Sequence, residues 1–118
     1  MINLPDLSNR LQELPSLIAR EAEIVEKARL SYDISIADYD RLEAKTALLI
    51  KAQNPITQSE LKYRVCNDEE VYTANLETIK KESEYRRREI DLKKLNDEFI
   101  SMRKISEIKI KELRVFSE

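Results

Sequence analysis

Apolar residues recur along one side of a predicted helix that spans residues 16–53. No proline or glycine interrupts this stretch. Apart from the adjacent Leu49 and Ile50, its apolar positions are separated by steps of three, four or seven residues, the spacing of an amphipathic helix. At 1.5 Å per residue the predicted helix is about 57 Å long. The positions are Ile18, Val25, Ala28, Tyr32, Ile36, Tyr39, Leu42, Leu49 and Ile50.

A second apolar pattern occupies the C-terminal half and predicts a helix over about residues 68–116. The pattern weakens between residues 80 and 89 and then resumes. Two long amphipathic helices joined by a short turn predict an all-α, elongated antiparallel helical hairpin. Because Glu21, Ser35 and Ser83 interrupt the seven-residue repeat, we expect bundle-like packing rather than a regular two-stranded coiled coil.

Prolines mark the predicted helix boundaries in the N-terminal half. Pro5 opens a short helix over about residues 6–14, and Pro15 begins the long helix of residues 16–53, because the first turn of a helix tolerates proline. Pro55 ends that helix, since the residue before a proline is disfavoured in the α conformation. Residues 54–57 are therefore predicted to form a turn.

The sequence after this turn carries helix-start signals. Thr57-Gln58-Ser59-Glu60 matches a capping box, in which the Thr57 hydroxyl accepts from the Glu60 N–H and the Glu60 carboxylate reaches back. A helix is thus predicted over about 58–66. Asn67, followed by three acidic residues, is a second candidate N-cap, where the helix either restarts as 68–116 or continues.

The composition excludes several classes of function. The 118 residues are enough for a single small domain. The absence of glycine removes phosphate-binding and dinucleotide-binding loops, and the absence of histidine removes the commonest general base and the usual zinc ligand. We therefore expect no enzyme activity, no cofactor, no metal site and no small-molecule substrate. The single Cys66 is interpreted as a small hydrophobic residue.

The sequence also predicts a cytoplasmic location without a membrane partner. The first residues lack the basic and apolar regions of a signal peptide. The longest wholly apolar run is residues 47–50, whereas a membrane span needs about 20 residues.

The charges nearly balance, with 21 Lys and Arg against 23 Asp and Glu, but the basic residues cluster. Guanidinium and ammonium groups bind phosphates, and Tyr85 can stack on an unpaired base. These clusters predict a nucleic-acid-binding surface; the alternative is a solvated helix face held by pairs such as Glu84 with Arg88. The candidate phosphate-binding residues are Lys80, Lys81, Arg86, Arg87, Arg88, Lys104, Lys109 and Lys111.

An apolar stripe near the C-terminus is interpreted as an association surface, and an acidic group on the first long helix as a solvated face. A lone two-helix hairpin covers little apolar surface, so the dense C-terminal stripe predicts self-association into a homo-oligomer. This stripe is Phe99, Met102, Ile105, Leu113 and Phe116. The acidic group on the first long helix is interpreted as a solvated face, because a di-metal bundle site would use histidine. Its members are Asp33, Asp38, Asp40 and Glu43.

Three short segments resemble the UvsY-like recombination mediators of tailed phages. They are Ser59-Glu60-Leu61-Lys62, the pair Asp68 and Val71, and the closing Arg114-Val115-Phe116. The resemblance implies a small helical protein, encoded by a phage and acting in the host cytoplasm, that oligomerises and binds single-stranded DNA. It also implies contacts with a single-strand-binding protein and with a RecA-like recombinase that the mediator helps to load. The alternative is a structural or adaptor coiled coil that assembles proteins without binding DNA.

Overall fold

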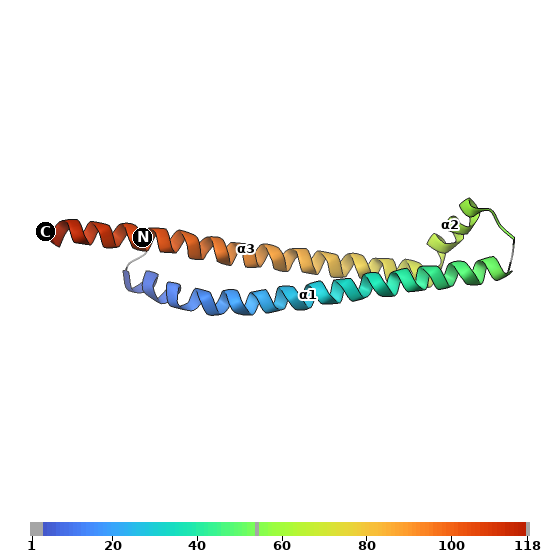
Figure 1. Ribbon diagram of the computed structural model, residues 1–118, viewed down its shortest axis with the longest axis horizontal. Helices are drawn as coiled ribbons and strands as arrows, with labels where there is room; N and C mark the ends of the chain where they lie inside the picture. Colours follow the sequence, from blue (N-terminus) through green and yellow to red (C-terminus); the bar gives the residue numbers. More distant parts are fainter. Residues whose placement is uncertain (1–3, 54, 118) are drawn as a thin grey trace. The chain divides into compact units, whose positions relative to one another are not determined.

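Over the residues that the structure describes, the chain forms three helices, shown in Figure 1. The structure is a computed structural model that describes residues 4–53 and 55–117. Helix α1 spans Leu4–Gln53, α2 spans Gln58–Asn67 and α3 spans Glu69–Ser117. They contain 50, 10 and 49 residues, and no strand occurs among the described residues. The predicted all-α class with two long helices is confirmed.

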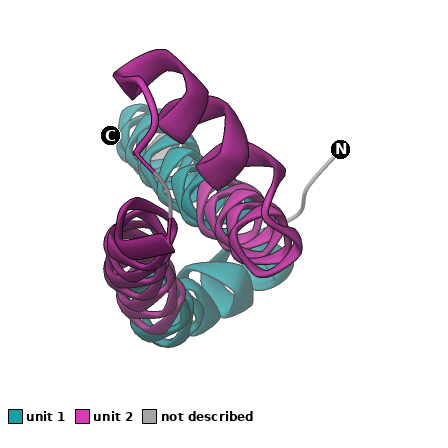
Figure 2. Cartoon of the chain, turned by 90° about the vertical axis from the view of Figure 1, so that its right-hand side faces the viewer, with its two compact units in different colours: residues 1–26, 87–118 teal, residues 27–86 magenta. Residues whose placement is uncertain are grey.

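The chain divides into two compact units (Figure 2). Unit 1 comprises residues 1–26 and 87–118, and unit 2 comprises residues 27–86. Each unit therefore pairs a segment of α1 with a segment of α3, and unit 2 also contains α2.

Contacts within each unit show that its α1 and α3 segments are antiparallel. In unit 1, Arg10 contacts Glu98 and Glu21 lies near Arg88, so the numbering rises on one helix as it falls on the other. In unit 2, Tyr32 stacks on Tyr85, and Ser35 accepts a hydrogen bond from Thr78 through its carbonyl oxygen.

The least exposed side chains of the two long helices recur every seven residues and form the seam of each hairpin segment. Every one of them is buried or half-buried, and this spacing is that of a coiled coil. On α1 the seam residues are Leu7, Leu11, Leu14, Ile18, Glu21, Val25, Ala28, Tyr32, Ser35, Tyr39, Leu42 and Thr46. On α3 they are Val71, Ala74, Thr78, Lys81, Tyr85, Arg88, Leu92, Leu95, Phe99, Met102, Ser106 and Lys109.

This repeat corrects the expectation that polar residues break the seven-residue pattern. Glu21 and Ser35 occupy seam positions as polar members of an unbroken repeat, while Ser83 is exposed and lies outside it. The sequence pattern weakens around residues 80–89 because Lys81, Tyr85 and Arg88 fill seam positions that are usually apolar.

The predicted boundary at Pro15 is wrong. Residues 6–14 and 16–53 belong to one helix, and Pro15 lies inside α1. A proline inside a helix removes one backbone hydrogen bond and costs about 3 kcal/mol. Leu7 and Leu14 are 1% and 0% exposed, so the two turns before the proline are held by burial. Packing therefore outweighs the local preference for a break.

The predicted restart after residue 57 is confirmed. Thr57 is the N-cap of α2, and its hydroxyl accepts a hydrogen bond of 3.3 Å from the Glu60 N–H. The Glu60 carboxylate lies 3.3 Å from Arg64 in the next turn, so it pairs forward along the helix instead of reaching back. Asn54 lies outside the described residues.

The chain restarts once more between α2 and α3, one residue later than the sequence suggests. Asp68 is extended, with φ −64° and ψ 131°, and its carboxylate accepts a hydrogen bond of 3.1 Å from the Val71 N–H. Asp68 is therefore the N-cap of α3. Asn67 closes α2 instead, because its side-chain amide donates to the Tyr63 carbonyl oxygen at 2.8 Å.

Candidate nucleic-acid interface and association surfaces

Exposed basic side chains recur on the side of α3 that lies outside the seam. Lys80, Arg87 and Lys94 are seven residues apart and all exposed, so they share one side of the helix; we call them the basic row. Arg86 and Lys93 are also exposed and precede members of this row by one position. Lys93 and Lys94 lie outside the predicted phosphate-binding set, although they follow Arg86 and Arg87 by seven residues and this spacing was the available signal.

Two of the predicted phosphate-binding residues occupy the seam rather than the exposed side. Lys81 is half-buried, and its ammonium lies 3.8 Å from the Glu77 carboxylate. Arg88 is half-buried, and its guanidinium lies 3.9 Å from Glu21 of α1. Glu21 Oε1 is buried without a hydrogen-bond partner, so the charge of Arg88 serves to neutralise a carboxylate inside the seam.

Acidic residues recur on α3 at the same spacing, three or four positions from the basic row and therefore next to it. Glu77, Glu84, Asp91 and Glu98 form this acidic row, and the last three are half-buried. Glu98 accepts hydrogen bonds of 2.7 and 2.9 Å from Arg10 of α1. The two rows therefore differ in exposure: the three cations of the basic row are exposed, whereas three of the four carboxylates of the acidic row are half-buried.

The predicted base-stacking residue already has aromatic and cationic neighbours. The Tyr85 ring stacks on Tyr32, with ring centroids 6.0 Å apart and an interplanar angle of 28°. The guanidinium of Arg86 lies 5.1 Å from the centre of the same ring. Tyr85 therefore has a packing role in unit 2, and base stacking by this side chain would require it to leave the seam.

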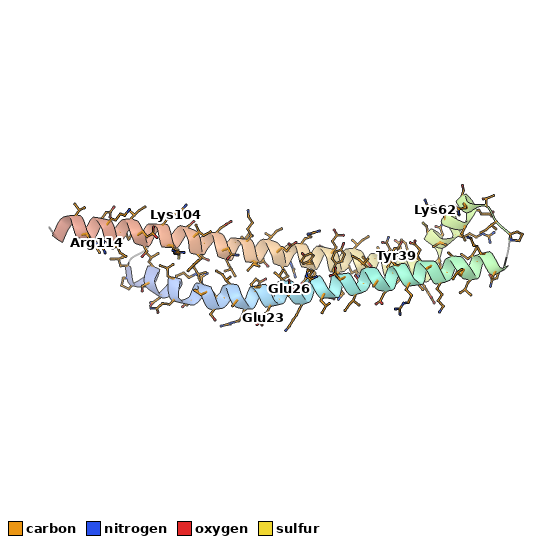
Figure 3. All side chains as sticks on the ribbon, viewed as in Figure 1. Glu23, Glu26, Tyr39, Lys62, Lys104 and Arg114 are labelled. Carbon is orange, nitrogen blue, oxygen red and sulfur yellow. The ribbon has the colours of Figure 1, made fainter. Side chains whose placement is uncertain are left out.

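The second basic group lies at the C-terminal end of α3. Figure 3 shows Lys104 and Arg114 on this segment, near the beginning of α1. Lys104 and Lys111 are exposed, whereas Lys109 is half-buried. Lys109 and Leu113 line a shallow hollow with Leu4, so Lys109 follows the side of α3 that meets α1 in unit 1.

The predicted association stripe divides into two parts. Phe99 and Met102 are half-buried seam residues, and Arg103 lies over the Phe99 ring at 5.8 Å. Ile105 and Leu113 are 37% and 55% exposed, while the Phe116 side chain lies outside the described residues. Four further apolar residues on this part of α3 are also exposed: Ile100, Ile108, Ile110 and Val115.

Helices α1 and α2 enclose a groove of about 520 Å³ that the sequence analysis did not foresee. Its apolar lining consists of Ala44 and Ala47 from α1 and of Leu61 and Val65 from α2. Charged and polar groups complete it, including the exposed Cys66, which is not the buried residue that its type suggests. We call this feature the α1–α2 groove; its remaining lining residues are Asp40, Glu43, Gln58, Ser59 and Lys62.

A hydrogen bond fixes one carboxylate at the edge of this groove. Glu43 accepts a hydrogen bond from the Tyr39 hydroxyl, and this bond raises the pKa of Tyr39 above its ordinary value of 10.0. Figure 3 shows Tyr39 on α1 and Lys62 on α2. The acidic group of α1 thus includes two members of a concave surface, Asp40 and Glu43, rather than a uniformly solvated face.

A second hollow, of about 620 Å³, lies between α1 and the start of α3 in unit 2. Its lining is rich in carboxylates, contributed by Asp38, Glu69, Glu70 and Glu77. Over the described residues, however, no group of His, Cys, Asp or Glu is arranged to hold a metal ion.

Comparison with known proteins gives no match to a family model, to a curated protein or to a solved structure. Among the helices described, none combines the length and the apolar character that crossing a membrane requires.

Proposed function

We propose that this chain is a non-enzymatic recombination mediator. In this proposal it self-associates, binds single-stranded DNA, contacts a single-strand-binding protein and helps to load a RecA-like recombinase. The recombination role follows from the resemblance of residues 59–62, Asp68, Val71 and residues 114–116 to UvsY-like mediators. The structural features of α3 support the DNA-binding part.

The observation that carries this proposal is the basic row. Lys80, Arg87 and Lys94 are exposed along α3, whereas three of the four carboxylates in the adjacent acidic row are half-buried, and Glu98 pairs with Arg10 of α1. Proteins that bind single strands without sequence preference use positively charged surfaces that follow the phosphate backbone. Self-association would repeat this row in every copy, so that a modest charge per chain adds up over the assembly.

The proposal is tested by titrating a fluorescent oligo-dT at two salt concentrations. The wild-type chain should bind more weakly at the higher concentration, because binding to phosphates releases counterions. The triple variant Lys80→Glu, Arg87→Glu, Lys94→Glu should lose affinity. Each phosphate contact removed should also reduce the salt slope by about 0.7.

The matched control places three charge reversals on α1. Lys27→Glu, Lys45→Glu, Lys51→Glu changes the net charge equally at exposed positions and should retain binding better than the α3 variant. Equal losses in both variants would mean that only overall charge matters. If neither variant loses affinity, the basic row is a solvated face, and Lys104 and Lys111 become the next residues to test.

The second candidate function is an adaptor that assembles proteins without DNA. Exposed apolar side chains on α1 favour it, because a partner helix can cover them; Leu30, Ile34 and Leu48 are 56%, 53% and 70% exposed. The same titration separates the two functions. Wild-type chain that fails to bind oligo-dT at low salt, yet captures a partner, would be an adaptor.

A further inference from the structure

The C-terminal tip of α3, defined as residues 104–115, has an apolar surface that no other helix covers. Leu4 at the start of α1 reaches the side of Lys109 and Leu113. A different side of the tip carries Ile108, Lys111, Glu112 and Val115, and these are the residues that line a hollow there among those the structure describes. Ile108 and Val115 are 56% and 72% exposed, so two apolar residues on the same helix face are open to a partner.

The α1–α2 groove in unit 2 has complementary properties. Its floor contains Ala44 and Ala47, whose small side chains allow another helix to approach closely, together with Leu61 and Val65. Its charged groups are Asp40, Glu43 and Lys62, two anions and one cation. The tip has the opposite balance, with four Lys or Arg residues and two Glu residues.

We propose that the C-terminal tip of one copy docks in the α1–α2 groove of a second copy. Ile108 and Val115 are seven residues apart, so both can face the apolar floor with Lys111 and Glu112 between them. Lys111 then lies opposite Asp40 and Glu43, and Glu112 lies opposite Lys62. Both complementary surfaces belong to the same chain, which is why the occupant is a second copy. This inference rests on the proposed self-association and specifies its geometry.

The proposed contact is heterologous, because the tip and the groove are different surfaces. Each copy contributes one tip and one groove, so copies join head to tail into a ring if the rotation closes and into a filament if it does not. An isologous contact between two tips would behave differently, since substitutions in the groove would then leave association unchanged.

A mixing experiment tests this geometry. The tip variant carries Ile108→Asp and Val115→Asp, and the groove variant carries Ala44→Trp and Asp40→Lys; all four positions are exposed. Sedimentation velocity should show each variant as a monomer at concentrations where the wild type associates. Because the tip variant keeps its groove and the groove variant keeps its tip, an equal mixture should form a species of two chains. Ile90→Asp, at an exposed position outside the tip and outside the lining of the groove, is the control and should associate like wild type.

The outcomes separate this inference from the proposed function. A groove variant that keeps the wild-type subunit number would overturn tip-in-groove docking, as would a mixture that remains monomeric, while self-association itself would stand. A wild-type chain that is monomeric at every concentration would contradict both. The charge exchange gives an independent check: Lys111→Glu should weaken association, and adding Asp40→Lys to the same chain should restore part of it.

Discussion

Arg10 and Glu98, 88 residues apart in sequence, join α1 to α3 in unit 1 through a two-pronged ion pair. The Arg10 Nε–H and Nη2–H groups donate to the two carboxylate oxygens at 2.7 and 2.9 Å. Such bidentate geometry aligns two side chains more strictly than a single contact does. Arg10 lies one turn from both Leu7 and Leu14, so the pair is next to the best-buried leucines of the unit. It fixes the alignment of the two helices where their apolar seam is tightest.

This ion pair should make stability depend on pH in the acid range. The hydrogen bond from Arg10 lowers the pKa of Glu98 below its ordinary value of 4.5. The Arg10–Glu98 pair therefore contributes its full stabilisation at pH values above 4.5. This stabilisation is lost as the pH falls through the lower pKa that Glu98 has in the folded chain. Thermal midpoints measured from about pH 2 to pH 7 should fall less steeply in Glu98→Gln than in wild type. Asp97→Asn, which removes an exposed carboxylate 4.0 Å from Lys93, should follow the wild-type curve.

Replacing the proline inside α1 should stabilise the protein. Pro15→Ala restores a backbone N–H within the helix and should raise the free energy of unfolding by roughly 2 kcal/mol, after allowing for the more flexible unfolded chain. Urea unfolding followed by circular dichroism measures the change. Pro55→Ala, at an exposed position outside the helices, should bring no comparable gain. A loss of stability in Pro15→Ala would mean that the bend imposed by the proline helps Leu7 and Leu14 to pack.

The two N-caps should contribute measurably, and their comparison locates the start of α3. Thr57→Ala and Asp68→Ala each remove the acceptor of a first-turn N–H and should cost about 0.5–2 kcal/mol. Asn67→Ala removes only a side-chain bond to a carbonyl oxygen and should cost less than Asp68→Ala. The reverse order in chemical denaturation would place the cap at Asn67, as the sequence alone suggests.

The Tyr32–Tyr85 stack should appear as a coupling between the two positions. A double-mutant cycle with Tyr32→Ala and Tyr85→Ala should give a coupling free energy of about 0.5–1.5 kcal/mol. Tyr32→Ala with Leu30→Ala provides the comparison, because Leu30 is exposed on the same helix. Additive effects in the Tyr32–Tyr85 cycle would mean that the rings do not depend on each other, and would leave Tyr85 available to stack on a base.

The titration of Tyr39 should report on its hydrogen bond with Glu43. Because the bond raises the Tyr39 pKa, Glu43→Gln should shift the Tyr39 component of the phenolate absorbance titration back toward pH 10.0. The hydrogen bond between Tyr39 and Glu43 therefore stabilises the fold at pH values below the Tyr39 pKa of the unfolded chain. This stabilisation is lost as the pH rises through the higher Tyr39 pKa of the folded chain. Asp40→Asn, a weaker influence on the same phenol, should move the transition less. An unchanged transition in Glu43→Gln would contradict the bond.

The sequence predicted the two long helices and the restart at Thr57 because these signals are local. The capping box at Thr57 and the absence of glycine act within a few residues, and both predict what the structure contains. Pro15 and Asn67 show where local reasoning fails. The effect of Pro15 was decided by burial of Leu7 and Leu14 against another helix segment, and the second cap differed by one residue because Asp68 and Asn67 are both good caps.

The candidate surfaces were harder to predict, because they depend on which side of a helix faces its neighbour. Lys81 and Arg88 belong to the same basic cluster as Lys80 and Arg87. The pairing of α1 with α3 places the first two in the seam and leaves the other two exposed. The α1–α2 groove brings residues 40–47 beside residues 58–66. No spacing rule along the chain reveals such a contact.

The chain changes direction between α2 and α3 at a single residue, Asp68, and it does so through one backbone torsion angle. Asp68 already has a helical φ of −64°, and only its ψ of 131° departs from the helical value near −42°. Turning that one bond would fuse α2 and α3 into an uninterrupted rod and would carry Leu61 and Val65 away from α1. The α1–α2 groove therefore depends on the ψ angle of Asp68. The hydrogen bond from the Val71 N–H to the Asp68 carboxylate holds this angle, together with the burial of Val65 and Val71.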